Sequence, residues 1–464
     1  MKRYSVAFRI RMALYCTFLI LSLTVLAARL GAFEPALAWY YRAAPNSPTV
    51  VFIVLDTVRA DRLSLCGYER PTSPTLERLV GEGASWTCHA VAPGSWTLPS
   101  HASFFTGLDV PAHGTHFSDE GEKIRGLVIR PLAHSFSTLA EQMAAAGYQT
   151  AGVSGNPVLV PASGLAQGFD SWRVAPAFGG WTGEVLAGQV REALRGLERD
   201  GKPLFLFVNI VDAHDPWLPV PAGLDWLPER PAGLAYFVSK EPGEWEAYVT
   251  GEMEDSEVEQ FRARLRDLYD YGVYRADRTL GRILEEIRRH GWAEAGMRLV
   301  VVSDHGEFLG EHGLARHGRY LWEPNNRVPL LVLDTERRVE LPTPVSALHA
   351  FSLVRDGALP ETLLHPHAVA FPDSLWLTRS RGRVGGSISA ALWSGSEKLL
   401  WMDGETARYD LESDPEELNP LAADGSPLIA ELEALVDRMR SSVRRGGALS
   451  DELIEALRAA GYVQ

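Results

Sequence analysis

Uninterrupted apolar runs, separated by segments with helical spacing, recur along the chain between residues 50 and 333. Such runs are typical of strands that are covered on both faces. Ser73 and Pro74 are typical of a helix start, and we expect the Ser73 side chain to cap that helix. The predicted strands are Val50–Leu55, Gln149–Val153, Leu204–Val211, Arg298–Val302 and Val328–Leu333, and the predicted helices are Ser73–Leu79, Ser137–Ala146 and Glu257–His290. This alternation predicts the α/β class, with a doubly wound, mostly parallel sheet flanked by helices.

Polar clusters follow three of these predicted strands directly. They are Asp56–Asp61, Asp212–Pro216 and Ser303–Glu307. In doubly wound sheets, functional sites gather at the carboxyl ends of the strands. A single Asp after a strand is more often a cap or turn residue, but three clusters after three apolar strands predict a common site.

The amino terminus has a different pattern. Residues 1–11 carry four basic side chains and no acid, and Met12–Ala28 is an uncharged, mostly apolar run of 17 residues. This pattern favours an uncleaved membrane anchor, with the remainder of the chain on the extracytoplasmic side. A cleaved signal peptide, with Ala36–Ala38 as the cleavage site and a secreted product, and a buried helix are the alternatives.

Composition narrows the functional classes. The 464 residues include 45 Lys+Arg and 59 Asp+Glu, giving a formal net charge of −14. An acidic chain of this kind is not a general nucleic-acid binder, since such proteins need a basic surface. Three cysteines are too few for a disulfide scaffold or a Cys-rich zinc module. Cys66 and Cys88 are able to pair outside the cytoplasm, but their spacing alone does not show it. We expect both to be buried, small apolar groups.

Two carboxylates and one imidazole in the strand-end clusters suggest a metal site. Asp56, Asp304 and His305 offer oxygen and nitrogen donors to one divalent cation. Mixed donors of this kind suit Mn²⁺, Ca²⁺, Mg²⁺ or Zn²⁺ and do not favour one of these ions over the others.

Thr97 is the candidate nucleophile. Pro99 suits the first turn of a helix, so Thr97 is expected at a helix amino terminus, where backbone N–H groups favour an anionic substrate. A nearby cation would make its alkoxide accessible. The alternative is that Thr97 only caps the helix. His214 and His317 are candidates for protonating a leaving group or binding a substrate oxygen.

Several of these segments resemble the sulfatase family of the alkaline phosphatase superfamily, in consistent order over about residues 48–422. The opening motif is Leu55–Asp61, Cys66–Tyr68 and Thr72–Leu76; the nucleophile segment is Thr97–His101, Thr106–Leu108 and His113-Gly114; the second metal segment is Ser303–Glu307, Gly310–Gly313 and Arg327–Leu330; and the carboxy-terminal signature is Tyr409–Glu417.

The resemblance implies an alkaline phosphatase-like fold and assigns roles to individual residues. Asp56, Asp304 and His305 would bind the metal, and Thr97 would be both nucleophile and a further ligand. His214 and His317 match positions that contact the transferred group or the leaving oxygen. The implied domains are an N-terminal anchor and linker (1–45), a catalytic domain (46–345), a smaller C-terminal α+β subdomain (346–425) and an exposed helical tail (426–464).

This chain departs from ordinary sulfatases at the nucleophile. Family members usually carry a Cys or Ser, followed by Pro and Arg, that is oxidised to formylglycine. Here Thr97, Pro99 and His101 occupy those positions, so formylglycine is not expected. The family's cationic Lys-x-His clamp is absent, and Asn156 lies in its neighbourhood. Asn156 and His101 are therefore candidate substrate-binding residues. Arg59 is another, unless it pairs with Asp61.

These observations predict a metal-dependent hydrolase or transferase that cleaves a phosphate or sulfate ester through Thr97. Phosphoryl transfer is favoured, because a Thr sulfate ester lacks the aldehyde exit of formylglycine. The alternatives are an arylsulfatase-like sulfuric ester hydrolase that works without formylglycine, and an inactive homologue that binds an anionic ligand. The expected partners are an anionic ester on a glycan, lipid or small molecule, and a membrane contacted by the N-terminal segment. The oligomeric state is open.

Overall fold

A computed structural model describes most of the chain after residue 46. The described residues are 47–118, 128–198, 200–230, 247–248, 251–318, 320–363, 365–370, 389–402, 404–442, 452–453 and 455. The predicted N-terminal anchor therefore lies outside the described residues. Within them, no helix has both the length and the apolar character needed to cross a bilayer.

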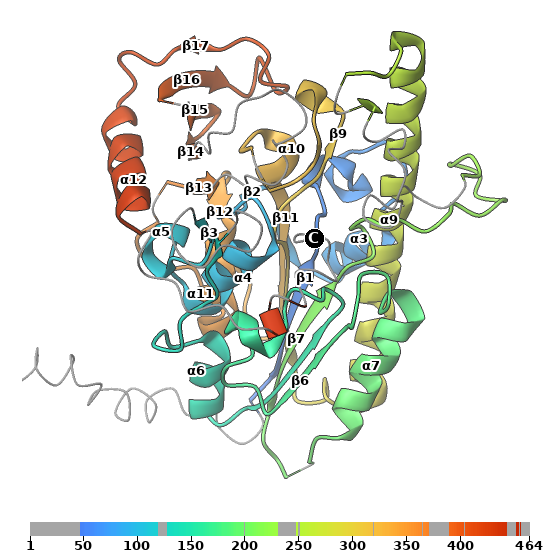
Figure 1. Cartoon of the computed structure of the whole chain (residues 1–464). Coiled ribbons are helices and arrows are strands. Elements are labelled where there is room, and N and C mark those ends of the chain that lie inside the picture. The colour runs from blue at the N-terminus through green and yellow to red at the C-terminus, as the bar shows by residue number, and fades with distance from the viewer. Residues whose placement is uncertain are drawn as a thin grey trace, which may run out of the picture.

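A central eight-stranded sheet runs through the molecule (Figure 1). Its spatial order is β12-β2-β11-β8-β1-β7-β5-β6. The strands are β1 (Thr49–Leu55), β2 (Ser85–Val91), β5 (Gln149–Ser154), β6 (Ser171–Val174), β7 (Leu204–Ile210), β8 (Met297–Ser303), β11 (Arg327–Asp334) and β12 (Val345–Ser346). Neighbours from β8 to β6 pair in parallel, which confirms the predicted fold class.

One predicted strand runs against this direction. β11 pairs antiparallel with both β8 and β2. The reason is its connection, because the described residues between 304 and 326 form no long helix. They form β9 (Phe308–Leu309), β10 (Ala315–Arg316), a short 3₁₀ turn and α10 (Glu323–Asn326). A parallel return needs a long crossover, usually a helix. The chain instead re-enters the sheet from the edge at which β8 ended, and this returning loop carries much of the candidate site.

Helices cover both faces of the sheet (Figure 1). The side chains of β1 alternate, so that Val50, Phe52 and Val54 join one core and Val51, Ile53 and Leu55 join the other. The helices α3 (Pro74–Gly81), α7 (Gly183–Arg195) and α9 (Asp255–Arg289) pack on one face, and α4 (Thr97–Thr106), α5 (Val110–His113), α6 (Leu139–Ala145) and α11 (Ala350–Asp356) lie on the other.

A second, antiparallel sheet forms a smaller C-terminal subdomain. It contains β13 (His367–Ala370), β14 (Ser389–Ser394), β15 (Glu397–Met402), β16 (Glu405–Asp410) and β17 (Leu421–Ala422), and a separate two-stranded ribbon is formed by β3 (Phe117–Ser118) and β4 (Val128–Ile129). The helix α12 (Ile429–Ser442), in the C-terminal tail, was expected to be exposed. That expectation is wrong for one of its faces, because Leu432, Leu435, Val436 and Met439 are buried against the main core.

The predicted cap of α3 is also wrong. Ser73 precedes the helix, but its hydroxyl accepts a hydrogen bond from the Leu65 N–H and contacts Ser64. The free N–H groups of Thr75 and Leu76 are instead satisfied by the Asp277 carboxylate, at 2.7 and 2.9 Å. An acceptor 200 residues away can replace a local cap because α9 packs beside α3.

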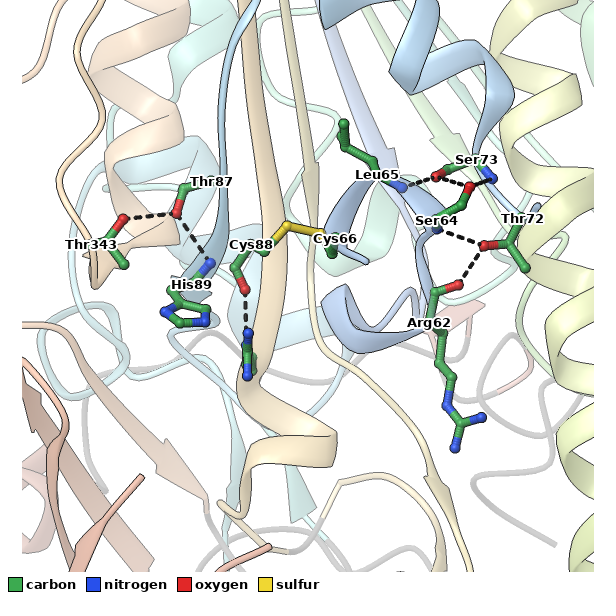
Figure 2. Close-up of a disulfide and its surroundings, with 11 residues drawn as sticks. Arg62, Ser64, Leu65, Cys66, Thr72, Ser73, Thr87, Cys88, His89 and Thr343 are labelled. Carbon is green, nitrogen blue, oxygen red and sulfur yellow. Dashed lines mark hydrogen bonds between the residues drawn. A yellow bond between two sulfur atoms is a disulfide. The ribbon is translucent and has the colours of Figure 1, made fainter. Parts of the chain in front are cut away.

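Cys66 and Cys88 form a disulfide (Figure 2). The preference for two unpaired apolar thiols is therefore wrong. The bond joins the 3₁₀ turn at Ser64–Cys66, shortly after β1, to the middle of β2. Hydrogen bonds from the Ser64 and Leu65 amides to Thr72 and Ser73 hold the same turn (Figure 2). The loop that follows the first strand is thus secured at two places.

Candidate active site

The strand register brings the two candidate aspartates together. Leu55 of β1 lies opposite Ser303 of β8, so the residues that follow each strand, Asp56 and Asp304, meet at the carboxyl edge of the sheet. His305 follows Asp304, and one donor atom from each of the three lies within 4.8 Å of the others. All three side chains are completely buried. We call Asp56, Thr97, Asp304 and His305 the cradle.

Asp56 presents one free oxygen. Its Oδ2 accepts hydrogen bonds from the side-chain amides of Asn156, at 2.8 Å, and Asn209, at 3.0 Å. Its Oδ1 is buried without a hydrogen-bond partner. Two amides from neighbouring strand ends therefore orient this carboxylate and leave one oxygen available.

Asp304 has the same asymmetry, produced by the backbone. Its Oδ1 accepts from the N–H groups of Thr57, at 3.2 Å, and His305, at 3.0 Å. Its Oδ2 is buried without a hydrogen-bond partner. Burial, and secondly the charge of Asp56, raise the pKa of Asp304 well above its ordinary value. Ionising both carboxylates in this place is unfavourable unless a cation accompanies them.

His305 turns a lone pair toward these oxygens. Its Nδ1 lies 3.0 Å from the Gly306 carbonyl, which can only accept, so Nδ1 carries the proton. Nε2 is then a lone-pair donor, 3.4 Å from Asp304 Oδ2 and 4.0 Å from Asp56 Oδ1. Burial lowers the pKa of His305 to about 4, so the ring is neutral near pH 7. Two unpartnered carboxylate oxygens and one neutral imidazole nitrogen fit a divalent cation.

Thr97 adds a hydroxyl to the cradle. It is the first residue of α4, after the N-cap residue Trp96. Its Oγ1 lies 3.4 Å from His305 Nε2 and accepts a hydrogen bond from the Asn156 amide at 3.2 Å. The Thr97 hydroxyl thus contacts His305, and no side chain caps α4 at its N-cap residue, which argues against the alternative of a simple helix cap. The amino end of α4 also places a partial positive charge beside it.

Asn156 and His101 contact the cradle from different sides. The amide of Asn156 donates to both Asp56 and Thr97, and its carbonyl oxygen accepts from the Val158 N–H. His101 lies one turn along α4, with Nδ1 2.8 Å from the Thr97 carbonyl. Burial lowers the pKa of His101 to about 4. Because His101 is buried and contacts the Thr97 backbone, we expect it to support Thr97 and not to bind substrate.

Arg59 is already engaged by the protein. Its guanidinium donates two hydrogen bonds to Asp61, one to the Glu307 carbonyl and one to Glu311, which uses four of its five N–H groups. Of the two alternatives for Arg59, this geometry favours pairing with Asp61 over binding substrate.

Of the other two candidate histidines, His317 lies beside His305 and His214 lies beside His317. The His317 ring centroid is 4.3 Å from that of His305 and 5.1 Å from that of His214. His214 donates its Nδ1 proton to the Asp215 carbonyl, stacks on Phe178 at 4.2 Å, and has a buried Nε2 without a hydrogen-bond partner. His317 Nδ1 is 3.2 Å from both carboxylate oxygens of Glu307.

Sequence reasoning missed Asn209, Glu307 and Phe178. Asn209 was detectable, because it is the one polar side chain in the apolar run of β7. Glu307 ends the segment Ser303–Glu307, but the sequence assigned no role to it. Phe178 carries no signal in the sequence, because only the folded loop places it on His214.

Comparisons with known proteins identify the family and the fold. The sulfatase family model matches residues 48–351. An arylsulfatase of Clostridium perfringens is 22% identical over 450 aligned residues, covering 81% of this chain and 90% of that protein. The crystal structure of a phosphonate monoester hydrolase of Agrobacterium radiobacter has a TM-score of 0.60 at 18% identity, covering 85% of this chain and 95% of that one. A structure solved with its substrate D-glucosamine-2-N,6-O-disulfate also has a TM-score of 0.60, at 17% identity, with coverage of 86% and 98%. These structures share the fold.

Proposed function

The chain belongs to the sulfatase family, and from this membership we propose that it is a metal-dependent hydrolase or transferase of phosphate or sulfate esters with Thr97 as nucleophile. One observation carries the proposal. The free oxygens of Asp56 and Asp304 and the lone pair of His305 lie together in a buried group, and the Thr97 hydroxyl is 3.4 Å from that His305 nitrogen. Three cation donors around a hydroxyl at a helix amino terminus suit nucleophilic attack on an anionic ester.

The reaction follows from these positions. A divalent cation held by Asp56, Asp304 and His305 would lower the pKa of the Thr97 hydroxyl and offset charge on the ester. Thr97 Oγ1 gives up its proton to solvent and forms a bond to phosphorus or sulfur. The bond from that atom to the ester oxygen breaks, and the leaving oxygen takes a proton from His214 or His317. Water or an acceptor alcohol then attacks the same atom and returns a proton to that histidine, and the released Thr97 oxygen regains a proton from solvent, which completes hydrolysis or transfer. The Asn156 amide keeps the Thr97 oxygen aligned with Asp56.

We favour phosphoryl transfer for one reason. A sulfated Thr lacks the aldehyde exit of formylglycine, whereas a phosphorylated Thr is resolved by in-line displacement. The charge of the site bears on the ester in a different way. Arg59 is paired with Asp61 and Arg316 with Asp215, and a buried cradle of two carboxylates and one divalent cation is formally neutral. It therefore suits a monoanionic ester, such as a phosphate diester, a phosphonate monoester or a sulfate ester, better than a dianionic phosphate monoester. Sulfuric ester hydrolysis is the second candidate, supported by the likeness to an arylsulfatase over 90% of that protein.

We also propose that the catalytic domain acts outside the cytoplasm. The Cys66–Cys88 disulfide supports this location, because such bonds persist in oxidising compartments. The basic and apolar pattern of residues 1–28 supports a membrane anchor preceding a catalytic domain from residue 46. The domain boundaries given above remain predictions.

Thr97→Ala tests the proposal most directly. We expect turnover of aryl phosphate diesters, phosphonate monoesters, phosphate monoesters and sulfates, assayed with Mn²⁺, Ca²⁺, Mg²⁺ and Zn²⁺, to fall to background. Thr106→Ala is the matched control, because its hydroxyl bonds the Ala102 carbonyl at the other end of α4. Mass spectrometry of a quenched reaction should find the phosphoryl or sulfuryl group on Thr97.

Three outcomes would contradict parts of the proposal. Full activity of the Thr97→Ala variant would exclude Thr97 as nucleophile, and turnover without any modified Thr97 would point to attack by water. A wild-type protein that turns over no ester would favour the inactive, ligand-binding homologue.

A further inference from the structure

Thr57 has an unfavourable backbone conformation beside the cradle. Its φ is 61°, in the left-handed region, where a β-branched side chain is strained. The conformation has a use, because it aims the Thr57 N–H at Asp304 Oδ1, 3.2 Å away. The Thr57 hydroxyl meanwhile donates to the Asp56 carbonyl at 2.7 Å. The strained turn therefore occupies one oxygen of Asp304 and leaves the other free.

A tyrosine from α9 holds this turn from outside. The Tyr269 hydroxyl donates to the Thr57 carbonyl at 2.6 Å and accepts from the Arg59 N–H at 2.9 Å. Tyr269 is completely buried, and its ring packs edge-on against Trp217. Burial raises the pKa of Tyr269 well above its ordinary value, so the phenol remains a donor. One hydroxyl thus satisfies the backbone on both sides of Val58.

The helix that carries Tyr269 is itself fixed to the same loop. Asp270 accepts hydrogen bonds from Tyr68 and Arg70, and Asp277 caps α3. These contacts, made by the residue next to Tyr269 and by one further along α9, fix this part of the helix relative to the chain that follows β1. A rigid support is what a strained turn needs, since strain persists only where the surroundings determine the conformation.

We propose that Tyr269 is a positioning residue for the metal site. It holds Thr57 in its strained conformation, and through the Thr57 N–H it keeps Asp304 Oδ2 directed at the cation. Tyr269 touches neither substrate nor cation, and the inference rests on the proposed metal-dependent function. Removing a group that orients a metal ligand without touching the metal typically weakens metal binding by about 10- to 100-fold.

Metal binding to the full chain tests this role apart from activity. Mn²⁺ affinity would be measured by calorimetry for wild type, Tyr269→Phe and Tyr248→Phe, together with each melting temperature. Tyr248 is the matched control, because its buried hydroxyl also joins a backbone carbonyl, that of Gly310, to an N–H donor, Arg262. We expect both variants to lose similar thermal stability, but only Tyr269→Phe to bind Mn²⁺ about 10-fold more weakly.

A second variant tests the strain itself. Glycine adopts a φ of 61° without a Cβ penalty, so Thr57→Gly combined with Tyr269→Phe should recover several-fold in Mn²⁺ affinity. If Tyr269→Phe alone fails to fold, recovery of folding and binding in the double variant supports the same conclusion. Weak binding that the double variant does not restore would contradict the clamp on Thr57.

The outcomes separate the two proposals. Normal wild-type binding with unchanged affinity in Tyr269→Phe overturns the role of Tyr269 alone. No Mn²⁺ binding by wild type, under conditions where it is folded, overturns the metal-dependent function and this inference with it.

Discussion

Two buried charged clusters in this molecule are built in opposite ways. In the cradle, Asp56 and Asp304 are fully buried, and among the described residues neither forms an ion pair with lysine or arginine. In the C-terminal subdomain, Lys398 is equally buried, but its ammonium contacts Glu417 at 2.6 Å, Glu323 at 3.1 Å and the Leu321 carbonyl at 2.6 Å, and lies over the Trp393 ring.

The difference separates a binding site from a structural joint. Burying charge without a partner costs several kcal/mol, so the excess negative charge of the cradle points to a cation that completes it. The charge of Lys398 is balanced by side chains of this protein, and the cluster joins the small sheet to Glu323 of α10. The same short helix also contacts the chain just before the nucleophile segment, since the Asn325 amide donates to the Ser95 carbonyl.

The largest effect is expected from Asp304→Asn. The substitution keeps the acceptor for the Thr57 and His305 N–H groups but removes the charge that binds a cation. Mn²⁺ binding should be lost and turnover should fall by about 1,000-fold or more. Because burial and Asp56 disfavour the ionised carboxylate, the metal-free variant should be about 1 kcal/mol more stable than metal-free wild type. Calorimetry measures Mn²⁺ binding, and denaturant unfolding with EDTA measures the stability of the metal-free protein. Retained Mn²⁺ affinity would contradict the assignment of Asp304 as a metal ligand.

Lys398→Met should have the opposite pair of effects, lowering stability while leaving metal binding intact. It leaves Glu417 buried without its cation, and we expect a loss of about 3–5 kcal/mol in unfolding free energy. Burial already raises the pKa of Glu417 to about 7, so adding Glu417→Gln should recover part of that loss. Mn²⁺ affinity should stay near the wild-type value.

Arg440→Met is a matched control for Lys398→Met, because Arg440 lies over the Trp401 ring while its side chain is 59% exposed. Its loss should cost less than about 1 kcal/mol. Equal losses from the two substitutions would erase the distinction between a buried joint and an ordinary surface cation.

Opening the disulfide between β2 and the turn after β1 should lower stability but have little effect on the cradle. Replacing Cys66 and Cys88 by Ser opens a disulfide with a sequence separation of 22, which should reduce unfolding free energy by about 3 kcal/mol. Mn²⁺ affinity should change little, because Tyr269 and Asp277 still hold the surrounding turns. Thermal unfolding with and without a reductant gives the comparison, and a marked loss of Mn²⁺ affinity would show that the disulfide also orders the cradle.

The amino-acid sequence was sufficient to predict β1, β5, β7, β8 and β11 of the central sheet and to propose the outline of the site, but it did not reveal β2, β6 and β12. Continuous apolar runs have few alternatives to a buried strand, and parallel strands present their carboxyl ends at one edge. Asp56, Thr97, Asp304 and His305 could therefore be proposed together from their places after β1, before α4 and after β8.

How these side chains are held depends on contacts between residues far apart in the sequence, which are seen only in the tertiary structure. The antiparallel direction of β11 depends on a return without a crossover helix, and the cap of α3 depends on Asp277 in a distant helix. The choice of which Asp304 oxygen is free depends on a strained Thr57 held by Tyr269, 212 residues away. Hydrogen bonds of this range leave no periodic pattern in the chain, because they depend on where packed elements meet.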